Sequence, residues 1–268
     1  MSFDLEAIGR PTDEHRYQVT EQALRAYADA TDDVPGGPVF AVVPASDAIA
    51  LASRSVASDD VRSRVVHYEQ DFLLHGQLEA GTTVVVQAVP IALLARPNGT
   101  SLVIHVVTRN EDGETLNEQY VTEFFRGIEA PASVGERPPD HRLEADGKPP
   151  LAEVAYQIAQ DQTVRYADAS GDHFAIHLDD EFARSVGLPG RIVHGLCAMA
   201  FTGRAVLEAA GIEDPRAIRR VAVRFSAPLF PGDTLTTRVW NLDEGTYGFV
   251  AAGSDGTLVI KDGRAELR

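Results

Sequence analysis

A single cysteine, Cys197, occurs among the 268 residues. One thiol cannot form an intramolecular disulfide, and it excludes metal sites built from several thiolates. Cations are scarce too: 24 Lys and Arg stand against 40 Asp and Glu, which gives a formal net charge of −16. Because nucleic-acid binding needs a basic surface, we expect no nucleic-acid partner, and a phosphate-bearing substrate would need a local cluster of cations.

Long apolar runs are missing as well. The longest extend to about ten residues, half of the roughly 20 that a bilayer-spanning helix needs. The N-terminal segment has no basic start followed by an apolar core, which is the pattern of a secretory signal. We therefore expect a cytoplasmic protein without a membrane partner. Hydrophobic residues still make up 44% of the chain, which is enough to build a globular core.

The chain repeats itself. Residues 17–33 and 156–172 align at an offset of 139, and 7 of these 17 positions are identical. Residues 130–150 are rich in proline and charge, which is typical of a linker. We therefore predict a degenerate first repeat over 1–130, a linker over 131–150 and a second repeat over 151–268.

Each repeat is predicted to place a helical section before a strand meander, which indicates an α+β fold with a long helix on an antiparallel sheet. In the second repeat we expect a helix after Asp179, an apolar helix over 195–211, and strands near 217–228, 234–242, 246–253 and 257–267. In the first repeat we expect Pro44-Ala-Ser-Asp to open a shorter helix, over 49–58. Asp33 lies 36 residues before Glu69, whereas Asp172 lies 51 before Val223, so the helical section of the first repeat should be shorter.

Asp172 and His177 are the first candidates for chemistry. A carboxylate and an imidazole that converge across a short non-helical stretch can hold one water and move its protons. The spacing alone also fits a helix-capping aspartate and a buried, hydrogen-bonded histidine. At the matching offset the first repeat has Asp33 but Pro38 in place of the histidine. We therefore expect one active site per chain, in the second repeat.

The start of the apolar helix is the second candidate. Backbone N–H groups there have no intrahelical acceptor and can bind a developing oxyanion, and Gly195 lets a carbonyl come close. Glycine can also simply ease the turn. Thr202 follows two helical turns later on the same face, where its hydroxyl can bond either a substrate or the helix backbone.

The segment from Tyr166 to Gly195 resembles the MaoC-like, (R)-specific enoyl-CoA hydratases, also called type-2 enoyl-CoA hydratases. Their motif reads Y-A-x-x-S-G-D-x-N-P-I-H-x-D, then a helix, then G-x-x-x-x-I-x-H-G. The matching residues are Tyr166, Ala167, Ser170, Gly171, Asp172, Ile176, His177, Asp179, Phe182, Ala183, Gly187, Gly190, Ile192, His194 and Gly195. Phe174 and Ala175 stand where the motif has Asn-Pro. The tandem arrangement is similar to the double hot-dog members, so the resemblance covers most of the chain.

The resemblance implies two repeats, each an antiparallel sheet wrapped around a central helix. It also implies hydration of trans-2-enoyl-CoA to (R)-3-hydroxyacyl-CoA, or the reverse. Asp172 and His177 would activate water, Gly195 would supply an N–H to the thioester carbonyl, and Thr202 would support the site. We assign His194, which precedes that glycine, to substrate binding. No metal or other cofactor is implied, because the coenzyme A thioester is the substrate.

The partner of such an enzyme would be an acyl thioester of coenzyme A or of an acyl carrier protein. Cations near the entrance could contact the anionic carrier, and the candidates are Arg191 and the group Arg216, Arg219 and Arg220. These residues could equally be ordinary surface cations. We expect a homodimer, although two hot-dog repeats in one chain could also pair internally and leave a monomer.

Two other functions remain open on the sequence. A hot-dog protein can hydrolyse thioesters instead of hydrating them, because a fold does not determine a reaction. Alternatively, the chain could bind acyl thioesters without turnover, and the replacement of Asn-Pro by Phe174 and Ala175 keeps that alternative open.

Overall fold

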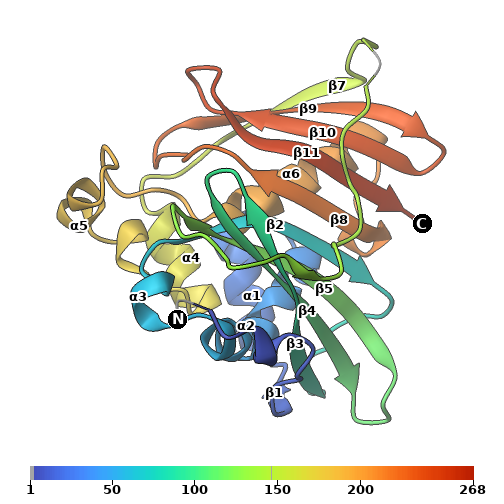
Figure 1. The fold of residues 1–268 in the computed structure, drawn as a ribbon. Coiled ribbons are helices and arrows are strands. Elements are labelled where there is room, and N and C mark those ends of the chain that lie inside the picture. Colours follow the sequence, from blue (N-terminus) through green and yellow to red (C-terminus); the bar gives the residue numbers. More distant parts are fainter. Residues whose placement is uncertain (1–2, 146) are drawn as a thin grey trace. The chain divides into compact units, whose positions relative to one another are not determined.

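The computed structural model describes residues 3–145 and 147–268. The chain forms two compact units, which we describe separately (Figure 1). The first contains the chain up to Val19 together with Pro44–Asp140, and the second contains Thr20–Val43 together with His141–Arg268. The units therefore differ from the predicted repeats in one segment, because residues 20–43 of the first repeat pack with the second unit.

The second unit is built on one antiparallel sheet with the strand order β8-β11-β10-β9-β7. The strands are β7 (Ala152–Gln157), β8 (Ile218–Phe225), β9 (Thr234–Asp243), β10 (Thr246–Ala252) and β11 (Leu258–Leu267). All neighbouring pairs run antiparallel. The last four strands lie where the alternating pattern predicts them.

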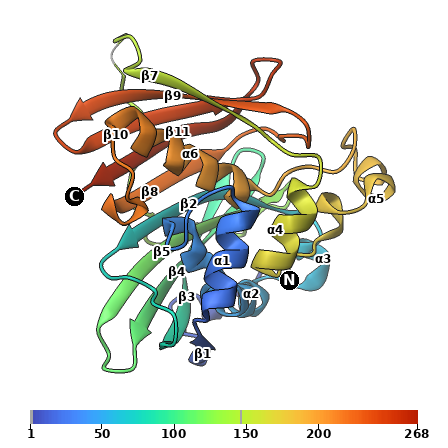
Figure 2. The ribbon, with the colours of Figure 1, turned by 180° about the vertical axis from the view of Figure 1, so that it is seen from behind.

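Helix α6 (Gly195–Ala210) lies against this sheet and contacts all five of its strands (Figures 1 and 2). Its sequence is apolar on nearly every side, which suits a helix surrounded by protein. Met199 is fully buried, and Phe201 is almost so. The helix ends at Gly211, which takes the left-handed conformation (φ +70°) that glycine adopts without strain. The predicted helix over 195–211 is thus confirmed.

The helices that precede α6 are shorter. The elements are α4 (Gln162–Ser170), the 3-10 helix η3 (Ala175–His177) and α5 (Asp180–Ser185); a further 3-10 helix, η4 (Pro215–Ala217), follows α6. Asp179 begins α5, because its carboxylate accepts hydrogen bonds from the N–H groups of Glu181 and Phe182 at 2.8 and 3.0 Å. The helix predicted after Asp179 is therefore confirmed.

Helix α1 (Glu21–Ala30) explains why residues 20–43 belong to the second unit. It packs beside α4 (Figure 2). The hydroxyls of Tyr27 and Tyr166 lie 3.0 Å apart, and the side-chain amide of Gln162 donates to the carbonyl of Ala30 at 2.6 Å. All these groups are buried, so the contact is a well-packed one. The 3-10 helix η2 (Pro38–Ala41) follows α1 in the same unit.

The first unit has a second antiparallel sheet with the order β1-β3-β4-β5-β2, and β6 pairs with β3. Its strands are β1 (His15–Gln18), β2 (Val65–Leu74), β3 (Thr83–Arg96), β4 (Gly99–Asn110), β5 (Thr115–Arg126) and β6 (Val134–Gly135); its short helices are η1 (Leu5–Ala7) and α3 (Asp59–Arg62). The longer helix α2 (Val42–Val56) contacts the sheet, since the Ser53 hydroxyl donates to Glu123 on β5 at 2.6 Å. The α+β double hot-dog prediction is therefore confirmed.

Helix α2 corrects two expectations. It begins at Val42, not at residue 49, because Pro44 lies in its first turn, where proline costs no intrahelical hydrogen bond. It has 15 residues against 16 in α6, so the first repeat does not have a markedly shorter central helix. By length and composition Pro38–Val56 is also apolar enough to cross a membrane, but 56% of that window is buried inside the protein, as in a core helix.

The predicted linker is held at both ends. On the first unit, β6 pairs with β3 through Val134 and Gly135. On the second unit, the ring of His141 hydrogen-bonds the carbonyl of Asp262 at 2.6 Å, and the indole of Trp240 donates to the carbonyl of Lys148 at 2.8 Å. Residues 131–140 thus belong to the first unit, and the described residues from His141 onward belong to the second.

Candidate active site

Asp172 is positioned by the end of α4. Gly171 takes a left-handed conformation (φ +80°) and stops the helix, so the chain turns immediately before the aspartate. The Asp172 N–H donates to the Ser170 hydroxyl at 3.2 Å, and its own Oδ1 accepts from the N–H of Phe174 at 3.1 Å. This local turn directs the carboxylate while leaving the residue exposed to solvent.

His177 ends η3 and is 8% exposed. Its Nδ1 lies 2.8 Å from the carbonyl of Ile192, which can only accept, so the proton is assigned to Nδ1 and the lone pair to Nε2. A backbone hydrogen bond from Ile192 to Ile176 holds the two segments together. Burial lowers the pKa of His177, and the Ile192 carbonyl and the Asp172 charge oppose that shift only in part. The ring is therefore neutral at pH 7.

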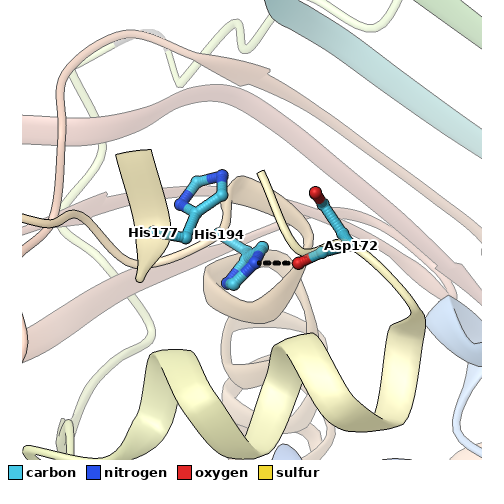
Figure 3. Close-up of side chains that lie close together, drawn as sticks. All are labelled: Asp172, His177 and His194. Carbon is cyan, nitrogen blue, oxygen red and sulfur yellow. Dashed lines mark hydrogen bonds between the residues drawn. The ribbon is translucent and has the colours of Figure 1, made fainter. Parts of the chain in front are cut away.

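His194 lies against His177 just before α6 (Figure 3). The two rings stack with centroids 3.7 Å apart and planes inclined by 23°. Nε2 of His194 donates to the backbone carbonyl of Asp172 at 3.0 Å. Its Nδ1 is buried and has no hydrogen-bond partner within the described part of the chain. Burial, followed by the proximity of His177, lowers the pKa of His194, so this ring is neutral too.

The predicted Asp172 and His177 therefore converge, and His194 joins them. One nitrogen of each histidine and one carboxylate oxygen of Asp172 all lie within 4.8 Å of one another. A carboxylate and two imidazole nitrogens at this spacing can hold a small polar molecule, such as one water. Asp172 is exposed to solvent, whereas both histidines are buried.

Gly195 is the first residue of α6 and follows His194 directly. The N–H groups of this first turn have no carbonyl one turn earlier within the helix, so they are available to an oxygen of partial negative charge. A Cβ at Gly195 would lie 3.0 Å from the nearest ring atom of Phe225. Packing against this ring therefore disfavours a side chain at Gly195.

The other predicted site residues have protein partners. The Thr202 hydroxyl is fully buried and donates to the Met199 carbonyl at 2.8 Å, which is the backbone alternative. Arg191 is half-buried. Its backbone N–H donates to the Asp180 carboxylate at 2.8 Å, and its guanidinium donates to the Gln160 carbonyl at 3.2 Å. The group of three arginines forms ion pairs: Arg216 with Asp214, and both Arg219 and Arg220 with Glu266.

Sequence reasoning missed a row of aromatic rings behind the cluster. The Tyr166 ring lies 4.7 Å from the His194 ring, and the Tyr27 ring lies 5.5 Å from Tyr166. Burial raises the pKa of both tyrosines, so both phenols keep their protons. The signal was available, because the two tyrosines are identical residues at the repeat offset of 139.

The corresponding position on the first repeat is a small hollow in the second unit. Tyr27, Asp33, Pro38 and Phe40 are among its lining residues, and no histidine is. Oδ1 of Asp33 accepts from the N–H of Val34 at 2.8 Å, much as Asp172 binds Phe174. Burial raises the pKa of Asp33. The first repeat therefore has the counterpart of Asp172, but no imidazole lies beside it in this hollow.

Comparison with known proteins shows what the chain is similar to. Residues 143–257 match the family described as MaoC like domain. The 3-hydroxyacyl-thioester dehydratase Y of Mycobacterium tuberculosis is 28% identical over 289 residues, which cover 99% of each chain. The probable enoyl-CoA hydratase 2 of Dictyostelium discoideum is 27% identical over 206 residues, 75% of this chain and 69% of its own. A MaoC-like dehydratase from Phytophthora capsici shares the fold, with a TM-score of 0.83 at 22% identity over 99% of both chains.

Proposed function

Because residues 143–257 belong to the MaoC-like domain family, we propose that this hydratase or dehydratase adds water to a trans-2-enoyl thioester to give the (R)-3-hydroxyacyl thioester, or catalyses the reverse reaction. The convergence of Asp172, His177 and His194 at one point carries the proposal. A carboxylate beside a neutral imidazole is suited to orient a water and take its proton.

His177 is the proposed base. Its Nδ1 proton is engaged by the Ile192 carbonyl, so Nε2 has the free lone pair. As the water oxygen bonds the β-carbon, one O–H bond breaks and the proton passes to Nε2. The electron pair of the double bond moves to the α-carbon and the carbonyl, and the imidazolium then returns a proton to the α-carbon. The Asp172 carboxylate orients the water and stabilises the imidazolium while it exists.

The first turn of α6 is the proposed oxyanion site. When water adds to the β-carbon, negative charge develops on the thioester oxygen, and the N–H of Gly195 can donate to it. One such donor is typically worth about 3–4 kcal/mol of transition-state stabilisation. The positive end of the helix dipole acts in the same direction.

The proposed substrate carrier is coenzyme A or an acyl carrier protein. His194 supports the water position, Arg191 contacts the carrier, and Thr202 has a supporting role through the α6 backbone. We propose a cytoplasmic homodimer that needs no metal or other cofactor and has neither a nucleic-acid nor a membrane partner.

The test is a hydration assay with crotonyl-CoA, in which enoyl absorbance, free thiol and product chirality are followed together. Loss of enoyl absorbance with an (R)-3-hydroxy product and no free thiol is the expected result. Release of thiol would indicate thioester hydrolysis instead. Binding of the thioester without turnover, across a series of chain lengths, would indicate a non-catalytic binding subunit and overturn the proposal.

A further inference from the structure

The short segment 192–194, which leads into α6, holds the proposed base through its backbone. The carbonyl of Ile192 accepts a hydrogen bond from Nδ1 of His177 at 2.8 Å. The next residue, Val193, is buried, and its N–H donates to the carbonyl of Leu229 at 2.8 Å. This second bond anchors the segment within its own unit, because Leu229 lies in the connection between β8 and β9. The backbone of the segment therefore holds one nitrogen of the base.

The last residue of the segment, His194, extends this hold to the carboxylate. Its Nε2 donates to the backbone carbonyl of Asp172 at 3.0 Å, and its ring stacks on that of His177 with centroids 3.7 Å apart. The ring of Tyr166 also lies 4.7 Å from it. His194 is 2% exposed, so the side chain has little room to move and little access to solvent. One buried side chain thus contacts both members of the pair and directly precedes Gly195.

His194 is poorly suited to exchange protons itself. The Asp172 carbonyl can only accept, so the proton of His194 is on Nε2. Nδ1 is buried and has no hydrogen-bond partner among the residues that the structure describes, so a second proton there would have no acceptor. Burial, followed by the proximity of His177, lowers the pKa of His194. The ring of His194 therefore stays neutral when His177 takes a proton.

We propose that His194 is a positioning residue, which fixes the ring of His177 by stacking and the place of Asp172 by its hydrogen bond, and which exchanges no proton in the reaction. The inference rests on the proposed function, because positioning is measured as a change in hydration. Two substitutions separate the two contacts. His194→Gln keeps an N–H donor and removes the ring, whereas His194→Phe keeps a ring and removes the donor.

The test measures steady-state hydration of crotonyl-CoA by both full-length variants between about pH 5 and pH 8. Each variant should lower kcat by about tenfold to 10²-fold, because a misplacement of about 1 Å can cost 10²-fold in rate. KM should change by less than about threefold, since His194 acts through the pair and not on the thioester.

The pH profile distinguishes positioning from a general structural role. In His194→Gln, loss of the stacked ring opens His177 to water, so the acidic limb of the kcat profile should move up towards the ordinary pKa of 6.5. In His194→Phe the ring remains, and the limb should keep its wild-type position. The other titratable groups beside the two histidines are Asp172, Tyr166 and the exposed His173. All three are present in both variants, so they cannot cause the difference.

His141→Asn is the matched control. His141 is 8% exposed in the same unit, and its Nδ1 hydrogen-bonds the backbone carbonyl of Asp262 at 2.6 Å. The substitution removes a buried imidazole and keeps a donor amide, so it should leave kcat and its pH profile unchanged even where stability falls. Wild-type kcat in both His194 variants would overturn the proposal. A rise in KM at constant kcat, or the same shift of the acidic limb in both variants, would overturn it too.

A measurement on the wild type serves where the variants do not fold. In ¹⁵N NMR of histidine-labelled protein, His194 should have its proton on Nε2 and remain neutral at the pH where His177 is half-protonated. Protonation of His194 before His177 would overturn the proposal. Absence of hydration by the wild type would refute the proposed function and the positioning role with it. Hydration by the wild type and equally by both variants would refute the positioning role alone.

Discussion

Two segments of the chain connect equivalent helices in different ways. After α1, residues 31–41 lead to α2; after α4, residues 171–194 lead to α6. Near its start each segment has an aspartate that accepts a hydrogen bond from a backbone N–H just after it, Asp33 from Val34 and Asp172 from Phe174. Only the second segment is long enough to add η3, α5 and the stretch that contains His194.

The comparison shows where the two repeats differ. Helices α2 and α6 have 15 and 16 residues, so the central helices are almost equal. The extra length of the second repeat lies in the connection, where it places His177 and His194 next to Asp172. The chemistry therefore depends on an inserted segment that the shared scaffold holds in place, and the predictions below test that dependence.

The largest effect on activity is expected from Asp172 and His177, compared with Asp33, the counterpart of Asp172 in the first repeat. Asp172→Asn or His177→Gln should lower kcat for hydration by about 10²–10⁴-fold, because each removes a positioned acid–base group. Asp33→Asn is the matched control, since its amide oxygen can still accept from Val34, and it should change kcat by less than about threefold. Steady-state kinetics with an enoyl-CoA measure both. Equal losses at Asp33 and Asp172 would mean that the repeats are not functionally distinct.

The next effect concerns the start of α6. In Gly195→Ala the new Cβ would meet the Phe225 ring at 3.0 Å, so the ring or the first turn must give way by a few tenths of an ångström, and because a misplacement of about 1 Å can cost 10²-fold in rate, we expect a loss of activity of up to about tenfold. Gly203→Ala is the control on the same helix, because its Cβ would meet Ile218 at an ordinary 3.7 Å. That variant should keep full activity and gain about 0.5–1 kcal/mol of stability. Hydration assays and urea unfolding of both variants test this prediction, and equal activity in the two variants would contradict it.

A smaller effect is expected where the two repeats contact each other inside the second unit. Tyr27→Phe or Tyr166→Phe leaves one buried hydroxyl without its partner at 3.0 Å, which should cost about 1–3 kcal/mol of unfolding free energy. The double variant should lose less than the sum of the two. Urea denaturation of the four proteins in the cycle measures the coupling, and strict additivity would show that the hydroxyl bond contributes nothing.

The smallest effect is that of pH. Burial places the pKa values of His177 and His194 below the ordinary 6.5. Below pH 6.5 the unfolded chain therefore binds more protons at these residues than the folded chain, so stability is full above pH 6.5 and falls with decreasing pH. His177→Gln should flatten this dependence, whereas His173→Gln should not. Thermal unfolding of the three proteins between pH 7.5 and pH 4.5 measures this dependence of stability on pH. The kcat of the wild type should fall only below pH 6.5.

Local patterns along the chain were sufficient for the fold class. The predicted ranges located the last four strands within a few residues, and Asp179 marked the start of α5. The same patterns misplaced the start of α2, because Pro44 was interpreted as a helix opening when it lies inside the first turn. They also assigned residues 20–43 to the first repeat, since no local signal reports that α1 packs on α4.

The sequence by itself determined the repeat, the α+β class and the Asp172 and His177 pair, because identity at a constant offset and hydrophobic periodicity are properties of the linear chain. Tertiary structure decided which nitrogen of each histidine is free, that His194 stacks on His177, and that Tyr27 lies behind the site. Tautomers and ring contacts depend on which carbonyls and rings approach one another in space. Ile192, Asp172 and Tyr166 reach the two histidines only once the chain has folded.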